Sequence, residues 1–141
     1  MATLTSTDDV YTYIGGIFRE ALADPVLGPQ LAASGVVLRL DYRHPDAVLV
    51  VDFPGGTVHL GPDGELPKAN ITLSMETELA HQYWLGRVNA AAALAKGQAR
   101  AKGSIPKILK LAALAKPLFP RYEASLRAAG LDRLVDEVGV R

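Results

Sequence analysis

The sequence contains no cysteine. This absence excludes disulfide bonds, thiolate nucleophiles and zinc sites built on cysteine, and it agrees with a reducing compartment. No uncharged apolar stretch approaches the roughly 18 to 20 residues that span a bilayer. The segment from Met1 to Thr7 lacks the charged and apolar regions of a signal peptide. We therefore expect a soluble, cytoplasmic protein.

Catalytic motifs are also missing. No Gly-x-Ser-x-Gly elbow, His-Glu-x-x-His helix or phosphate-binding glycine loop occurs. His81 and Glu78, three residues apart on a predicted helix, imitate a base and its orienting carboxylate, but exposed pairs of this kind are common. We therefore expect no enzyme activity, no metal site and no cofactor.

Acidic residues are absent from the 44 residues between Leu79 and Tyr122, which contain eight lysines and arginines. Residues 1–78 contain eleven acids and four basic residues, so the net charge of zero hides a polarised chain. A basic surface attracts phosphates, anionic lipid headgroups or nucleic acid. Nucleic acid is disfavoured, because aromatic side chains that stack on bases are absent from Leu85 to Leu118.

The apolar content, in contrast, is high. Of the 141 residues, 49% are hydrophobic and 21% are charged. A chain of this length forms one domain with one core. We therefore expect residues 1–141 to form a single domain.

The order of predicted elements indicates an α/β (α+β) fold. A helix begins at Ser6 and Thr7 and ends at Asp24, and a turn-rich segment with Pro25 and Pro29 follows. Period-two alternation and turn residues then predict four strands, at 36–43, 47–53, 57–60 and 70–75. Helices are predicted at 76–85, 89–95 and 105–116, with a fifth strand at 98–102. Short connections favour antiparallel pairing of the first strands as a meander, and we expect a mainly antiparallel, five-stranded sheet with helices on one side.

The segment Gly86-Arg87-Val88-Asn89, then Ala93, then the glycine-bounded basic stretch of residues 97–103 (GQARAKG), resembles the signature of the sterol carrier protein type 2 family, the sterol-binding domain. The resemblance extends over about residues 8–128. It implies a five-stranded sheet covered by helices, with an apolar tunnel that holds a sterol, fatty acid, acyl-CoA or phospholipid without chemistry. From the residues alone, Asn89 is predicted to cap the following helix.

Apolar residues of the second half are the predicted tunnel wall. By periodicity alone, the stripe of residues 105, 108, 109 and 112 favours an ordinary core helix, whereas the resemblance favours a ligand-facing role. Tyr83 and Trp84 fit a cavity wall, base stacking or core filling. The predicted ligand-binding residues are Ile71, Leu73, Leu79, Tyr83, Trp84, Leu94, Ile105, Ile108, Leu109, Ala112, Leu118 and Phe119.

Three lysines are candidates for an anionic contact. Lys107 and Lys110 lie one turn apart on another face of the last predicted helix, and Lys102 precedes it. They form a solvated face, or they bind an anionic ligand head or membrane surface. The expected function is non-covalent binding, and transfer, of a lipid or acyl ligand. Two alternatives are a small enzyme, or an enzyme's substrate-presenting partner, and a protein-interaction module with an apolar groove.

Overall fold

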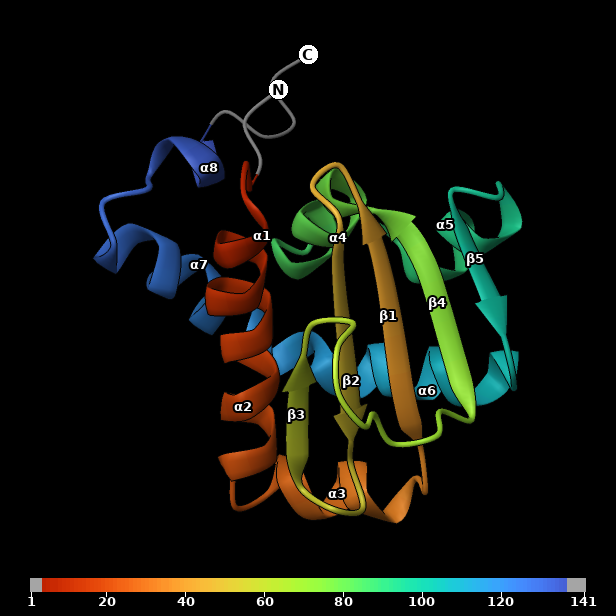
Figure 1. Cartoon of the computed structure of the whole chain (residues 1–141). Helices are drawn as coiled ribbons and strands as arrows, with labels where there is room; N and C mark the ends of the chain where they lie inside the picture. Colours follow the sequence, from red (N-terminus) through yellow and green to blue (C-terminus); the bar gives the residue numbers. More distant parts are fainter. Residues whose placement is uncertain (1–3, 137–141) are drawn as a thin grey trace.

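The computed structural model describes residues 4–136 and contains a five-stranded sheet in the order β3-β2-β1-β4-β5 (Figure 1). The strands are β1 Val37–Arg43, β2 Ala47–Asp52, β3 Thr57–Leu60, β4 Ile71–Glu76 and β5 Ala99–Lys102. Only β1 and β4 pair in parallel, and the other neighbouring strands are antiparallel. The predicted α+β class and the mainly antiparallel, five-stranded sheet are therefore confirmed.

The meander extends over the first three strands only. β1, β2 and β3 follow one another, but β4 pairs with β1 instead of β3. Asn70 connects the starts of the two parallel strands. Its backbone N–H donates to the Val37 carbonyl (3.0 Å), its side-chain Oδ1 accepts from the Val37 amide (2.9 Å), and its Nδ2 donates to the Gly35 carbonyl (2.9 Å). These hydrogen bonds fix the register of β4 against β1.

The first helical stretch runs beside β3 and comprises α1 Thr7–Asp9, a π-helical turn η1 Val10–Ile14 and α2 Gly15–Ala23 (Figure 1). Ser6 caps it, because its Oγ accepts a hydrogen bond from the Asp9 amide (3.1 Å). Gly15 permits close packing on the sheet, since a Cβ there would lie 3.1 Å from the Leu60 side chain. The predicted first helix is confirmed.

The segment after α2 is helical, which corrects its prediction as turns. Helix α3 spans Leu27–Ala33. Proline is tolerated in the first helical turn, where the backbone N–H has no helical partner, and Pro29 occupies such a position. The Asp24 carboxylate caps the segment by accepting from the amides of Val26 and Leu27 (both 2.9 Å). These two N–H groups, with Arg121, lower the pKa of Asp24 to about 2.

The remaining helices follow the strands. They are α4 Thr77–Trp84, α5 Ala90–Ala95, α6 Ile105–Ala115, the 3-10 turn η2 Lys116–Leu118, α7 Phe119–Ala128 and α8 Arg133–Asp136. In Figure 1, α6 passes behind the sheet, and α4 and α5 lie on the same side. Asn89 caps α5 as predicted, because its Oδ1 accepts from the Ala92 amide (2.9 Å).

No helix within residues 4–136 is long and apolar enough to cross a bilayer.

The two faces of the sheet differ in chemistry. Along β1, Leu38, Leu40 and Tyr42 are buried on the helix-covered face, as the period of two in a strand requires. Arg39 and Asp41 alternate with them on the open face and pair at 3.0 Å. The helices therefore cover the apolar face, and any internal cavity has to lie there.

Candidate ligand-binding cavity

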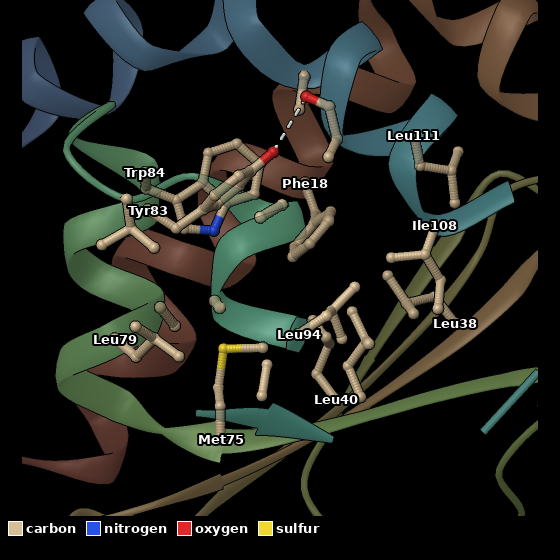
Figure 2. Close-up of a pocket in the computed structure, with 18 of the residues that line it drawn as sticks. Phe18, Leu38, Leu40, Met75, Leu79, Tyr83, Trp84, Leu94, Ile108 and Leu111 are labelled. Carbon is tan, nitrogen blue, oxygen red and sulfur yellow. Dashed lines mark hydrogen bonds between the residues drawn. The ribbon is translucent and has the colours of Figure 1, made fainter. Parts of the chain in front are cut away.

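A cavity of about 120 Å³ lies between the sheet and the helices (Figure 2). Its floor consists of inward-facing side chains of the central and β5-side strands: Leu38, Leu40, Tyr42, Leu73, Met75 and Ala99. Every described side chain in its wall is aliphatic, aromatic or methionine, and none carries a charge. A wall without charged groups offers water few hydrogen-bond partners, so the space suits an apolar ligand.

Small side chains keep this space open. Alanines from α4, α5, β5 and α6 line the cavity, where larger residues would close the gap between helices and sheet: Ala80, Ala90, Ala93, Ala99, Ala112 and Ala115. Protein interiors are otherwise close-packed, and voids larger than a water molecule are few. With Ala21 of α2, alanines from five elements line the cavity, which is therefore a feature of the fold and not a single packing defect.

Aromatic rings form a rigid corner of the wall. Phe18 and Trp84 meet edge to face with ring centroids 5.3 Å apart, and Tyr83 meets Trp84 at the same distance. The Tyr83 hydroxyl donates a hydrogen bond to the Ala112 carbonyl (3.1 Å) and so ties α4 to α6 (Figure 2). Core filling and cavity lining, which were alternative interpretations of Tyr83 and Trp84, are thus the same role.

The structure brings most of the predicted ligand-binding residues to one cavity. Those in its wall are Leu73, Leu79, Tyr83, Trp84, Leu94, Ile108, Ala112 and Leu118. Ile71, Ile105, Leu109 and Phe119 are not part of it. Ile71 is buried beside Gly103, Ile105 is 43% exposed, and Leu109 is half-buried. The half-buried Phe119 ring packs on the Tyr83 ring, with centroids 5.3 Å apart.

The apolar stripe predicted on α6 does not coincide with the face of this helix that lines the cavity. The cavity-facing residues are Ile108, Leu111, Ala112 and Ala115, which follow the i, i+3, i+4, i+7 spacing of one helical face. The prediction began this pattern one turn too early, at residue 105. Apolar residues occur around most of this helix, so periodicity alone permits either phase. The position of α6 over the sheet determines which of the two apolar faces is buried.

Several wall residues come from the first half of the chain, which the predicted site did not include. Phe18 comes from α2, Leu31 from α3, and Leu38, Leu40 and Tyr42 from β1. The alternation of β1 already indicated an apolar inner face. Leu31 had no such signal, because the prolines around it favoured turns.

The three predicted anion-contacting lysines lie outside the cavity wall. Lys102, Lys107 and Lys110 are exposed, and among residues 4–136 none of them forms an ion pair. Lys107 makes one long contact, from Nζ to the Ser34 carbonyl (3.5 Å). These side chains are therefore free to meet an anionic surface.

His81 is buried away from the cavity wall, with 0% of its surface exposed. Its Nε2 lies 2.8 Å from the Leu134 carbonyl, which can only accept, so Nε2 carries the proton. The Nδ1 atom consequently accepts from the Tyr122 hydroxyl (2.7 Å). Burial lowers the pKa of His81, and the nearby Arg87 charge acts in the same direction. The imidazole ties α4 to α7 and α8, and both its nitrogens are occupied by this structural role.

Comparison with known proteins agrees with this geometry. The sequence profile described as "SCP-2 sterol transfer family" matches residues 18–116. No curated protein sequence matches the chain.

Solved structures with the same fold include sterol carrier protein 2 from Yarrowia lipolytica in its apo form, with 21% identity, TM-score 0.59 and coverage of 77% of this chain and 92% of that one. Palmitated SCP2L2 from Aedes aegypti has 20% identity and TM-score 0.58, and the match covers 76% of this chain and 94% of that one. UbiJ-SCP2, a ubiquinone synthesis protein, has 18% identity and TM-score 0.58, and the match covers 77% of this chain and 95% of that one.

At these identities the structural likeness shows the fold, while the profile match covers more than half of the chain. The chain belongs to the SCP-2 sterol transfer family.

Proposed function

We propose that the protein binds one lipid molecule non-covalently in the cavity between sheet and helices, and transfers it. The observation that carries the proposal is the uncharged, alanine-rich wall. At about 0.8 kcal/mol per buried methylene, a chain of about 12 to 16 carbons gains on the order of 10 kcal/mol before association and ordering costs. Micromolar binding therefore requires no charged contact.

The composition of the wall supports binding over catalysis. Nucleophilic or acid–base catalysis needs an ionisable group near the reacting atoms. Tyrosines are the only cavity-lining residues in the described chain with a titratable side chain, and burial raises the pKa of both Tyr42 and Tyr83 well above its usual value. The one buried histidine is held between Tyr122 and Leu134. We propose a carrier without chemistry of its own.

Family membership and one similar structure support a lipid ligand, with sterol, fatty acid, acyl-CoA and phospholipid as the candidate classes. The similar Aedes aegypti protein is palmitated. A second role, presenting a lipid to an enzyme, is supported by the similar UbiJ-SCP2, which is a ubiquinone synthesis protein. In both roles the cavity holds the ligand, and only the recipient differs.

Native mass spectrometry of the purified protein, followed by organic extraction, tests this proposal. A co-purified lipid that is released on extraction is the expected result. A bound polypeptide without lipid would instead support a protein-interaction module, and an empty protein with turnover of a lipid substrate would support an enzyme. Either of these results would contradict the carrier.

We further propose that the exposed lysines contact anionic membranes during transfer. Replacing Lys102, Lys107 and Lys110 together with glutamine is expected to slow lipid transfer from anionic vesicles and to leave transfer from neutral vesicles nearly unchanged. Added salt should act in the same way, because raising ionic strength from about 0.01 to 0.15 M shortens the Debye length from about 30 to 8 Å. Stopped-flow transfer of a fluorescent lipid measures both effects. Insensitivity to salt and to the triple substitution would make these lysines a solvated face only.

A further inference from the structure

Two polar side-chain groups in the cavity wall have no hydrogen-bond partner within residues 4–136, the Tyr42 hydroxyl and the Trp84 indole N–H, and of these only the hydroxyl can both donate and accept. Tyr42 belongs to the inward-facing row of β1 and is 5% exposed. Its cross-strand neighbours on the same face are Ala47 and Met75, which offer no side-chain hydrogen bond to a hydroxyl in this position. Within residues 4–136 the Tyr42 hydroxyl makes no hydrogen bond to any other group.

This situation is unusual for a buried tyrosine. Buried tyrosine hydroxyls normally find a partner, because a buried polar group without one is unfavourable. The other two tyrosines near this part of the core obey the rule. The Tyr83 hydroxyl donates to the Ala112 carbonyl (3.1 Å), and the Tyr122 hydroxyl donates to His81 Nδ1 (2.7 Å). Only Tyr42 combines a position in the wall with a free hydroxyl.

The free hydroxyl lies at one end of the β1 row. Leu38 and Tyr42 are four residue steps apart along the strand, or about 13 Å at 3.3 Å per residue. Both line the cavity, with Leu40 between them. An elongated ligand along β1 would therefore meet aliphatic side chains over most of its length and a hydroxyl at one end.

The chemistry of this end selects the kind of ligand atom. Burial, and then the nearby Tyr83, raise the pKa of Tyr42 well above its usual value, so the hydroxyl remains neutral. A carboxylate placed here would lose its hydration in exchange for one neutral donor, which is strongly unfavourable. An uncharged oxygen, as in an alcohol, ketone or ester, needs one hydrogen bond and could receive it.

We propose that Tyr42 is the polar anchor of the cavity and hydrogen-bonds an uncharged oxygen of the bound lipid. This inference rests on the proposed lipid-binding function and deepens it. It assigns the ligand as an uncharged, oxygen-bearing lipid whose polar atom is buried at the Tyr42 end. It also makes Tyr42 a specificity-determining residue and the only hydroxyl in the described wall that a ligand can use, since the Tyr83 hydroxyl is already engaged.

A matched pair of ligands tests the anchor. Displacement of 11-(dansylamino)undecanoic acid by 1-dodecanol and by dodecane gives the affinity of two chains that differ by one hydroxyl. Tyr42→Phe is expected to lower the dodecanol-to-dodecane affinity ratio about 2- to 10-fold, the range for one net hydrogen bond. The dodecane affinity itself should change little, because the ring remains.

Thermal unfolding of the empty protein provides a second readout. Tyr42→Phe should leave the Tm unchanged or raise it, because a hydroxyl without a partner is removed. Tyr122→Phe is the comparison, since it removes a buried hydroxyl that has a protein partner and lies outside the cavity wall. It should lower the Tm and leave the dodecanol-to-dodecane ratio as in the unsubstituted protein.

Two results would overturn the anchor. One is an unchanged ligand ratio in Tyr42→Phe while both ligands still bind. The other is a fall in Tm as large as that of Tyr122→Phe, which would mean that the Tyr42 hydroxyl has a partner in the protein. Failure of the proposed function looks different, because then neither dodecanol nor dodecane would displace the fluorescent acid from the unsubstituted protein.

Discussion

Replacing Ala112 by phenylalanine is expected to weaken lipid binding at least tenfold while the protein remains folded. Ala112 lies in the cavity wall on α6, opposite the sheet. A phenyl ring at this position occupies space that a ligand chain needs, and each excluded methylene removes about 0.8 kcal/mol of binding free energy. Loss of two to four methylene contacts therefore suffices for a tenfold to hundredfold effect. Titration with a fluorescent fatty acid analogue measures it.

The neighbouring Ala113 provides the matched control. It lies on the same helix but is exposed, so Ala113→Phe adds the same ring without touching the cavity. Its affinity should stay within about twofold of the unsubstituted protein. If Ala112→Phe proves overpacked and unfolds, Ala93→Leu on α5 fills the same cavity from another side. Equal affinities in the wall-facing and the exposed variants would contradict the assignment of this cavity as the ligand site.

Replacing His81 by leucine should lower the free energy of unfolding by about 2–4 kcal/mol, because two buried polar groups lose their partner. These groups are the Tyr122 hydroxyl and the Leu134 carbonyl. Adding Tyr122→Phe to the same protein should recover part of the loss, since one of the two unpaired groups is then removed. Urea unfolding of the single and double variants measures both effects. A loss below about 0.5 kcal/mol would contradict the structural role of His81.

The same histidine predicts how stability depends on pH. An unfolded histidine takes up a proton near pH ~6.5, whereas burial lowers the pKa of His81 in the folded protein. Between these two pKa values the unfolded state binds more protons, so stability is lost as the pH falls from about 6.5 to the folded pKa. The slope is at most about 1.4 kcal/mol per pH unit. It should disappear in His81→Leu, while the carboxylates of Asp24 and Glu76, whose pKa values are lowered, titrate at more acidic pH.

Local signals in the sequence were sufficient for most of the fold. Alternation of polar and apolar residues identified the strands, and Asn89 marked the start of α5 because its cap is a local interaction. The pairing of β4 with β1 depends on contacts of Asn70 with residues more than 30 positions away. Contacts between residues so far apart in the sequence produce no periodic pattern of polar and apolar residues. The order of the strands was therefore beyond what the pattern could predict.

Prediction of the cavity residues from the sequence is limited in the same way. The cavity residues from α4 to α6 were found largely because the glycine-bounded segment resembles the sterol carrier signature. Leu31 was missed because Pro29 suggested a turn, although a proline in the first turn of a helix is compatible with it. Tyr42 could not be singled out at all, because a free hydroxyl is defined by what surrounds it in three dimensions. Empty space and unpaired groups are properties of packing that a sequence pattern does not encode.

The central claim is that the apolar cavity holds one lipid molecule, and saturation titration of the delipidated protein with a fluorescent fatty acid analogue tests it most directly. The expected result is saturable binding of about one molecule per chain, at micromolar or lower Kd, because a domain of this size has one such site. Competition by unlabelled lipid should abolish the signal. An absence of saturable binding for fatty acid, sterol and phospholipid analogues alike, in a protein that is folded by circular dichroism, would contradict it.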